Sequence, residues 1–331
     1  MKIAVIVIGL CLVFAILIVR PLIKIRCTSS MTGEPPEAHR PQITHNLYRH
    51  VEVLSREIGS RSVHECGKLK QAQTYIETCL REYGMAGEAQ DYTVNGKTYS
   101  NVVVTLPGTK NPPQTIVIGA HYDTVADTPG ADDNASAVSL LLEICRALRG
   151  YSPDNTVKLV FFTLEEPPVY DTRNMGSYVF ARDAKERDED IKLMICLEMI
   201  GYYNHRGKGQ EFPLPLMNLF YSPVPDFVLV IGDIASRKMV LLTGDTIGRA
   251  SGLRVETLAV PQFFSGIKLS DHSSFWKNGY RAIMITDTAF YRNPNYHTSG
   301  DTIDTLDFNK MTALCEGMVQ TVRAISRQAC I

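Results

Sequence analysis

The stretch TIVIGAHYDTVADTPGADDNASAVSLLLEICRAL, residues 115–148, decides how the 331-residue sequence is interpreted. Residues 115–120 form a short apolar run that predicts a buried strand, and residues 137–148 predict an apolar-rich helix. His121 and Asp133 flank the loop that leads from this strand to this helix. Because α/β proteins place their chemistry on such loops, the pair predicts a metal-binding site at the end of a strand.

The same alternation of strand and helix continues along the chain. Further strand-length apolar runs lie at residues 101–106, 157–163, 192–197, 227–231 and 282–286, and a helix is expected at residues 236–250. Asn95-Gly96 predicts a hairpin turn between strands near residues 91–94 and 97–99. This alternation predicts an α/β fold with a mixed, mostly parallel central sheet and helices on both faces.

Helices are also expected at both ends of the folded region. Residues 45–58 and 69–83 have apolar residues at helical spacing, and each segment stops at a glycine, Gly59 or Gly84. A last helix is expected at residues 308–327, with Asp307 as its N-cap. Residues 182–190 carry mixed charges and are interpreted as solvated surface.

Composition and cysteine spacing exclude several function classes. The net charge of −1 and the lack of a basic stripe give no reason to expect a nucleic acid partner. The eight cysteines include no C-x-x-C pair, so neither a zinc ribbon nor a redox dithiol is indicated. Cys145 and Cys196 are expected to be buried thiols, whereas Cys66 and Cys79 could pair in an extracytoplasmic domain. No G-x-S-x-G elbow suggests a serine hydrolase.

The first residues predict a membrane anchor. Residues 3–19 carry no charge and are just long enough to span a bilayer, and no A-x-A-like cleavage site follows them. We therefore expect an uncleaved anchor or signal at residues 1–26, a linker at 27–42 and one catalytic domain at 43–331. The two-residue tail before the apolar run resembles an export signal, which favours an extracytoplasmic domain. Arg20, Lys24 and Arg26 outnumber Lys2 and favour the opposite orientation.

Acidic residues and imidazoles recur where the predicted strands end. If these strands are parallel, their carboxyl ends share one edge of the sheet, and six side chains can converge there. The six are His121, Asp133, Glu165, Glu166, Glu198 and His297. Two imidazoles and three carboxylates suit two zinc ions with one bridging carboxylate, and the sixth group remains available as a base.

Each of these residues has an ordinary explanation when it is taken alone. A Glu-Glu pair usually lies on a solvated surface, and a lone buried histidine is usually a satisfied core residue. Asp133-Asn134 alone would be typical of a helix N-cap. The occurrence of four such motifs in order at strand ends favours an active site.

The motifs together resemble a known family. The order H-Y-D, G-A-D-D-N-A-S, L-E-E, L-E-M-I-G-Y-Y, S-D-H-S-S-F and Y-H-T-S-G-D-T is similar to the di-zinc exopeptidases of metallopeptidase clan MH. This group includes bacterial leucyl aminopeptidase, aminopeptidase Y and glutamate carboxypeptidase II. The resemblance covers about residues 101–307 and implies a zinc-exopeptidase fold that is phosphorylase/hydrolase-like.

The resemblance also implies a role for each candidate residue. It assigns His121 and Glu198 to one zinc ion, Glu166 and His297 to the other, and Asp133 to both. Glu165 would be the general base, Asp123 would orient His121, and Tyr296 would contact the developing oxyanion. Asp301 would support His297, and the peptide bond after Asp133 would be cis. Glu198 replaces an aspartate that many members have, and Pro167-Pro168 replaces a glycine-rich turn.

The predicted function is that of a membrane-tethered, zinc-dependent exopeptidase that acts on peptides, most simply an aminopeptidase. A carboxypeptidase of the same family stays open, since Arg173 or Arg292 could bind a C-terminal carboxylate. Two further functions stay open as well: a glutaminyl-cyclase-like acyl transferase with one zinc ion, and an inactive binding domain. The sequence does not indicate the preferred substrate side chain or the oligomeric state.

Overall fold

The computed structural model describes residues 40–328 apart from 205–206, 208 and 214. The predicted anchor and most of the predicted linker lie outside the described residues. In the part of the chain that is described, no helix is both long enough and apolar enough to cross a membrane.

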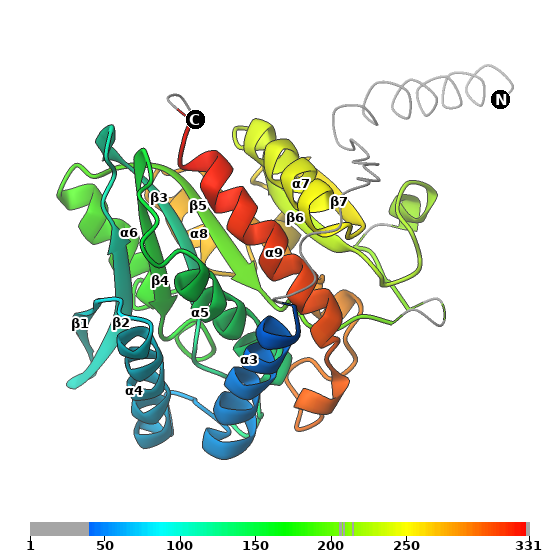
Figure 1. Cartoon of the computed structure of the whole chain (residues 1–331). Helices are drawn as coiled ribbons and strands as arrows, with labels where there is room; N and C mark the ends of the chain where they lie inside the picture. Colours follow the sequence, from blue (N-terminus) through cyan, green and yellow to red (C-terminus); the bar gives the residue numbers. More distant parts are fainter. Residues whose placement is uncertain (1–39, 205–206, 208, 214, 329–331) are drawn as a thin grey trace, which may run out of the picture.

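An eight-stranded mixed sheet forms the centre of the molecule (Figure 1). Its strands follow the order β1-β2-β4-β3-β5-β8-β6-β7. Their bounds are β1 Gly87–Val94, β2 Lys97–Leu106, β3 Asn111–His121, β4 Asn155–Phe162, β5 Asp190–Glu198, β6 Val228–Asp233, β7 Val255–Val260 and β8 Ala282–Thr286. The neighbours β4, β3, β5 and β8 are mutually parallel, whereas β2 runs antiparallel to β4 and β6 runs antiparallel to β8. The four parallel strands therefore end at one edge, as predicted.

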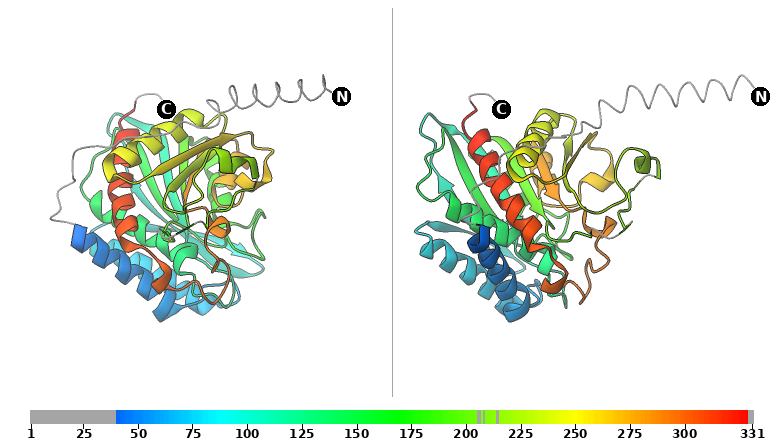
Figure 2. Two further views of the ribbon diagram at one scale, coloured as in Figure 1. Left: turned by 90° about the vertical axis from the view of Figure 1, so that its right-hand side faces the viewer. Right: turned by 45° about the vertical axis from the view of Figure 1, so that its right-hand side comes forward.

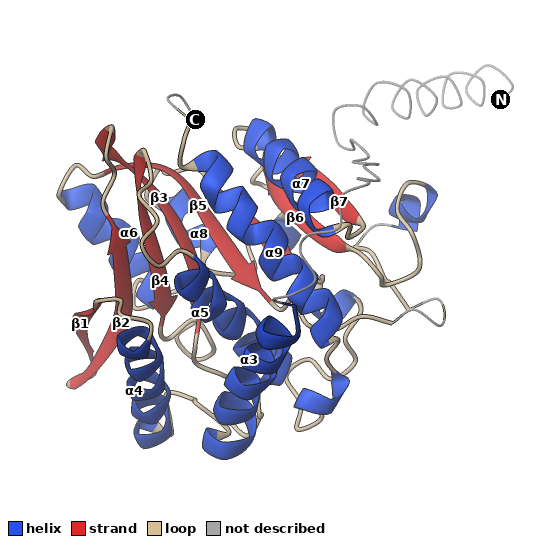
Figure 3. Cartoon of the chain, viewed as in Figure 1, coloured by secondary structure: helices blue, strands red, loops and turns tan. Residues whose placement is uncertain are grey.

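Helices cover both faces of this sheet (Figures 2 and 3). One face carries α3 Arg40–Glu52, α4 Cys66–Glu82, α5 Ala137–Ala147, α7 Arg237–Ser251 and α9 Phe308–Ile325, and the other carries α6 Gly176–Glu186 and α8 His272–Lys277. Side chains of β3 alternate between the two faces. Ile116 and Ile118 pack in the core under α5, and Val117 packs in the core that contains Phe180 and Phe275. Both faces of the sheet are buried.

Short helical turns connect the main elements. A π-helical turn, η3 Val53–Ile58, follows α3. A second one, η4 Ala131–Ser136, precedes α5. The 3-10 turns are η5 Pro215–Leu219, η6 Ser265–Ile267, η7 Ala289–Tyr291 and η8 Ile303–Thr305. The η4 turn matters most for function, because it contains Asp133 and ends the loop that begins at His121.

Most predicted elements are confirmed. The hairpin between β1 and β2 turns at Asn95 and Gly96, whose φ angles of 50° and 74° are those of a tight two-residue turn. The first predicted helix corresponds to α3 followed by η3, which ends before Gly59, and the second corresponds to α4, which ends before Gly84; both glycines have positive φ. Asp307 caps α9 by accepting a hydrogen bond from the backbone N–H of Lys310.

Other elements differ from the prediction. α3 begins at Arg40, so residues 40–42 are helical rather than part of the linker. β7, α6 and α8 were not predicted, and part of the mixed-charge run forms the exposed end of α6. Cys66 and Cys79 are free thiols on the same helix, so they form no disulfide with each other.

Candidate metal centre

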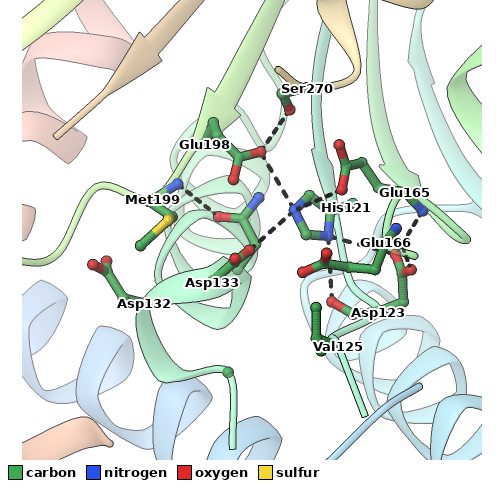
Figure 4. Close-up of polar contacts among 12 residues, drawn as sticks. His121, Asp123, Val125, Asp132, Asp133, Glu165, Glu166, Glu198, Met199 and Ser270 are labelled. Carbon is green, nitrogen blue, oxygen red and sulfur yellow. Dashed lines mark hydrogen bonds and ion pairs between the residues drawn. The ribbon is translucent and has the colours of Figure 1, made fainter. Parts of the chain in front are cut away.

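The six candidate side chains meet at the shared edge of the parallel strands. His121 and Glu198 are the last residues of β3 and β5, Glu165 and Glu166 follow β4, and Asp133 lies in η4. His297 comes from the loop after β8. Their donor atoms form three overlapping groups in which all atoms lie within 4.8 Å of one another: His121–Asp133–Glu198, Asp133–Glu166–His297 and His121–Glu165–Glu166. Figure 4 shows His121 surrounded by the carboxylates of Asp133, Glu165 and Glu198. The predicted convergence is therefore observed.

The Asp133 carboxylate lies between the two imidazoles. Its Oδ1 atom is 3.4 Å from His121 Nε2, and its Oδ2 atom is 3.2 Å from His297 Nε2. Glu198 Oε2 is 3.3 Å from His121 Nε2, and Glu166 Oε2 is 3.3 Å from His297 Nε2. Both imidazoles thus lie close to Asp133. His121 also lies close to Glu198, and His297 also lies close to Glu166.

This donor set fits zinc. Donors about 2.1 Å from a tetrahedral zinc ion lie about 3.4 Å from one another, and the four distances from the imidazoles to Asp133, Glu198 and Glu166 agree with that value. Four buried donor atoms have no hydrogen-bond partner among the described residues: His121 Nε2, Asp133 Oδ1, Glu166 Oε1 and His297 Nε2. Buried polar atoms without partners are costly unless a ligand satisfies them, and a cation would do so.

Asp123 lies beside His121, as expected from the sequence. His121 Nδ1 is 3.5 Å from Asp123 Oδ1 and 3.3 Å from the backbone oxygen of Asp123. The two carboxylate oxygens of Asp123 also accept hydrogen bonds from the backbone N–H groups of Glu165 and Glu166, at 3.1 and 3.0 Å. The buried Asp123 carboxylate thus contacts both His121 and the loop after β4, and it fixes their relative position.

The prediction that Asp301 contacts His297 was wrong. The Asp301 carboxylate accepts hydrogen bonds from the backbone N–H groups of Asp132 and Asp133, at 2.8 and 3.0 Å. Asp301 therefore holds the backbone of η4 and the shared ligand Asp133. The peptide bond between Asp133 and Asn134 is cis, as the resemblance implied.

Two polar residues at the centre were not singled out from the sequence. The Ser270 hydroxyl donates to Glu198 Oε2 at 2.6 Å, and the Asn134 side chain bonds the backbone of Leu197 and Met199 at 3.1 and 3.0 Å. Both contacts fix Glu198 where β5 ends. Ser270 belongs to the quoted S-D-H-S-S-F motif, so this motif was the available signal.

Three residues at or next to the ligand positions have a left-handed backbone. Leu164, Met199 and His297 have φ angles of 57°, 41° and 56°. Such conformations are unfavourable for residues other than glycine and persist where the surrounding structure imposes them. Leu164 precedes the two glutamates, Met199 follows Glu198, and His297 is itself a candidate ligand. The left-handed backbone at these positions therefore helps to orient the candidate ligands.

Burial and charge act together on the protonation of the cluster. Without a cation, burial raises the pKa of Glu165 well above its ordinary value and that of Glu166 to about 8. Burial opposes the charged form of His297, but its contacts with Asp133 and Glu166 raise the pKa of His297 to about 10. Burial thus favours the protonated form of Glu165 and Glu166 as long as no cation is bound.

We expect the metal-free protein to lose stability as the pH rises from about 4 to about 8. Burial raises the pKa of Asp271 and Asp301 to about 7, and that of Glu166 to about 8. A carboxyl whose folded-state pKa lies above its unfolded value stabilises the fold below the unfolded pKa. This contribution is lost as the pH rises through the folded pKa. Asp133, whose pKa is lowered by the two imidazoles despite its burial, acts in the opposite sense only below about pH 4.

Urea unfolding of the chelator-treated protein across this pH range measures the effect. Saturating zinc should reverse the slope, because zinc binds the deprotonated ligands. A metal-free protein whose free energy of unfolding stayed constant or increased over this range would contradict the expectation.

Comparison with known proteins is consistent with this geometry. Residues 101–322 match the family described as peptidase family M28. The protein YfbL of Escherichia coli is 37% identical over 292 residues, which cover 86% of this chain and 89% of the relative. A probable leucine aminopeptidase of Trichophyton verrucosum is 26% identical over 286 residues, which cover 80% of this chain and 68% of the relative.

Solved structures share the fold. BSAP, a zinc aminopeptidase from Bacillus subtilis, aligns with a TM-score of 0.69 and 14% identity over 86% of this chain and 95% of its own. A glutaminyl cyclase of Bacteroides thetaiotaomicron aligns with a TM-score of 0.62 and 18% identity over 85% of this chain and 97% of its own. The match to the family model, which spans two thirds of the chain, carries the assignment. The chain belongs to peptidase family M28.

Proposed function

We propose that this protein is a zinc-dependent aminopeptidase that removes N-terminal residues from peptides. The observation that carries the proposal is the buried Asp133 carboxylate, whose two oxygens lie 3.4 Å from His121 Nε2 and 3.2 Å from His297 Nε2, while Glu165 lies 3.9 Å from His121. The similarity to a probable leucine aminopeptidase and to the fold of a zinc aminopeptidase supports it.

The donor set divides between two zinc ions. His121 and Glu198 would hold one ion, Glu166 and His297 would hold the other, and Asp133 would bind both. Zinc would supply Lewis acidity, which makes water a nucleophile at neutral pH and polarises a peptide carbonyl.

Glu165 is the group available for proton transfer. Its Oε2 atom lies 3.9 Å from His121 Nε2, farther than the Asp133 and Glu198 oxygens, so it is the least suited of the three to share a ligand position with His121. It is buried, and its backbone is fixed by Asp123. We assign Glu165 as the base that accepts a proton from the attacking water and donates it to the leaving amine.

Tyr296→Phe should lower kcat about 100-fold with little change in KM. The Tyr296 ring stacks on the imidazole of the candidate ligand His297 with ring centroids 3.7 Å apart, which supports a role for Tyr296 at the centre. A hydroxyl that hydrogen-bonds the oxyanion acts mainly in the transition state, and loss of one such donor costs about 10²- to 10³-fold in kcat. Steady-state kinetics test this, with Tyr291→Phe on the neighbouring turn η7 as the control. An unchanged kcat would remove Tyr296 from the mechanism.

The charges near the centre favour recognition of a substrate amine. Glu165 and Glu198 are buried carboxylates that can attract a cationic N-terminus. Arg292, one of the two arginines considered for a C-terminal carboxylate, is only 5% exposed. Its guanidinium donates to Gln210, to Thr288 and to the backbone oxygens of Tyr202 and Phe227. Of the two arginines, the exposed Arg173 is the one that remains for the carboxypeptidase alternative.

One peptide in three forms tests which end is cut. The zinc-loaded enzyme should cleave the free peptide and its C-amidated form, and it should not cleave the N-acetylated form. The reverse pattern, in which amidation stops cleavage and acetylation does not, would replace the aminopeptidase with the carboxypeptidase.

The glutaminyl-cyclase-like alternative has weaker support. The fold likeness to a glutaminyl cyclase, at 18% identity, concerns the fold alone. The five candidate ligands form two donor groups that have Asp133 in common, and this supports two ions over one. Measured release of pyroglutamate from glutaminyl peptides, with no cleavage of ordinary peptides, would favour the cyclase.

We also propose that the catalytic domain lies on the outer face of a membrane, held by residues 3–19. The support is the uncharged run itself, which is just long enough to span a bilayer and resembles an export signal. Protease treatment of intact cells should digest the domain. A domain that is digested only after the membrane is broken would place it in the cytoplasm.

A further inference from the structure

Arg61 is a fully buried arginine beside the metal centre, with 0% of its surface exposed. It lies in the segment between η3 and α4. Its guanidinium makes no ion pair with a carboxylate among the described residues, and it donates only to backbone carbonyl oxygens. A charge buried without a paired carboxylate destabilises a fold, so stability alone does not explain this residue.

Three of its five carbonyl partners belong to the loop between β3 and η4. Nε donates to the oxygen of Tyr122 at 2.9 Å, Nη1 to that of Pro129 at 2.8 Å, and Nη2 to that of Gly130 at 2.9 Å. The backbone N–H of Arg61 donates to the Thr124 hydroxyl of the same loop at 2.8 Å. One side chain thus binds the loop at both of its ends.

The remaining two partners tie this loop to the helical layer. Nη1 also donates to the oxygens of Leu54 and Gly59, at 2.8 and 3.1 Å. Leu54 lies in η3 and Gly59 directly follows it. Arg61 therefore connects the end of the first helical segment to the loop that precedes the shared ligand.

The loop has little room to move against Arg61. Gly130 has a φ of +60°, and a Cβ atom at this position would clash with Thr124 Cγ2 and lie 2.9 Å from Arg61 Nη2. Burial lowers the pKa of Arg61 to about 10, so the guanidinium stays charged at neutral pH. Its charge acts through space on the carboxylates of Asp301, Asp123, Asp133 and Glu166.

We propose that Arg61 is a positioning residue of the metal centre, which sets the distance between His121 and Asp133 by fixing the loop that joins them. The proposal rests on the two-zinc site of the proposed function. Lysine cannot replace arginine in this role. Its single ammonium keeps the charge but cannot spread donors over three nitrogen atoms that point in different directions.

Three variants separate positioning from general stability. Arg61→Lys keeps the charge and loses the fork of donors. Thr124→Val keeps Arg61 and the shape of residue 124 but removes one bond to the loop. Leu80→Ala is the control, since Leu80 is a fully buried side chain of α4, a helix that carries none of the ligands. The readouts are zinc affinity by competition with a coloured chelator, the d–d absorption of the cobalt-substituted protein, thermal unfolding, and kcat and KM measured separately.

Arg61→Lys should weaken zinc binding by roughly 10- to 100-fold, the usual effect of removing a group that orients a ligand. It should also alter the cobalt spectrum and lower kcat with little change in KM. Thr124→Val should change zinc affinity and the cobalt spectrum in the same direction by a smaller factor. Leu80→Ala should lower the unfolding temperature and leave zinc affinity and the cobalt spectrum unchanged.

An Arg61→Lys protein that is less stable but has wild-type zinc affinity and spectrum would overturn the inference. If Arg61→Lys does not fold, Thr124→Val decides, and wild-type zinc binding by that variant would overturn it. A wild-type chain that binds no zinc would instead overturn the proposed function, so the two failures are distinguishable.

Discussion

Glu165→Gln is expected to lower kcat by about 10²- to 10⁴-fold while the protein keeps its fold and its zinc. Glutamine has nearly the same shape as glutamate, but its amide cannot accept the proton of the attacking water. The closer contacts of the imidazoles with Asp133, Glu166 and Glu198 are not affected by this change. Steady-state kinetics and zinc content, measured on the same sample, check the prediction.

The neighbouring Glu166→Gln is the matched control. Glu166 Oε2 lies 3.3 Å from His297 Nε2, within the donor group that contains Asp133 and His297. This variant should therefore lose zinc affinity, and added zinc should restore part of its activity. If both variants kept near wild-type kcat, the assigned roles of the two glutamates would be wrong.

Asp133→Ala should have the largest effect on metal binding, because in the proposed centre this one carboxylate would bind both ions. Each Asp133 oxygen faces a different imidazole, so its removal takes a donor from both groups. We expect neither ion to bind tightly and activity to be lost. The zinc-dependent gain in stability, about 2.7 kcal/mol at a zinc concentration roughly 100 times the Kd, should be lost as well.

Two further variants serve as controls for Asp133→Ala. Asp127→Asn changes an exposed aspartate of the same loop and should leave zinc binding unchanged. Glu198→Gln should weaken only the ion held by His121, since Glu198 belongs to that group alone. Calorimetric titration with zinc distinguishes the three proteins. Tight binding of two ions by Asp133→Ala would contradict the bridging role.

The convergence of the candidate ligands could be predicted because it depends on two features that are visible in a sequence. Apolar runs mark the strands, and His121, Glu165, Glu166 and Glu198 directly follow or end them. Four of these strands are parallel neighbours, so the residues at their ends meet at one edge. The hairpin at Asn95-Gly96 was predictable for a similar reason, since two residues alone determine that turn.

Most of the supporting contacts could not be predicted, because they join distant segments and several of them involve backbone atoms. Arg61 binds five carbonyl oxygens, and any residue type supplies a carbonyl, so no motif marks its partners. The family resemblance implied that Asp301 supports His297. Its carboxylate reaches back to the backbone of η4 instead. Ser270 reaches Glu198 across 72 residues of sequence.

The missed elements have local causes. β7 is a six-residue strand, VETLAV, that contains the charged but buried Glu256, so its apolar pattern is interrupted. α8 spans only six residues and contains two serines, which favour helix ends over helix interiors. The helix α6 was not predicted because charged residues follow its buried Val179, Phe180 and Ala181 and interrupt the apolar pattern.

The number of zinc ions per chain tests the central claim most directly. Purified protein lacking the first 39 residues would be saturated with zinc, dialysed against metal-free buffer and analysed for zinc and protein content. Two ions per chain are predicted, since the five ligands and their spacings exceed what one tetrahedral zinc ion can use. One ion per chain, unchanged by excess zinc, would contradict the bridged centre and favour the cyclase-like alternative.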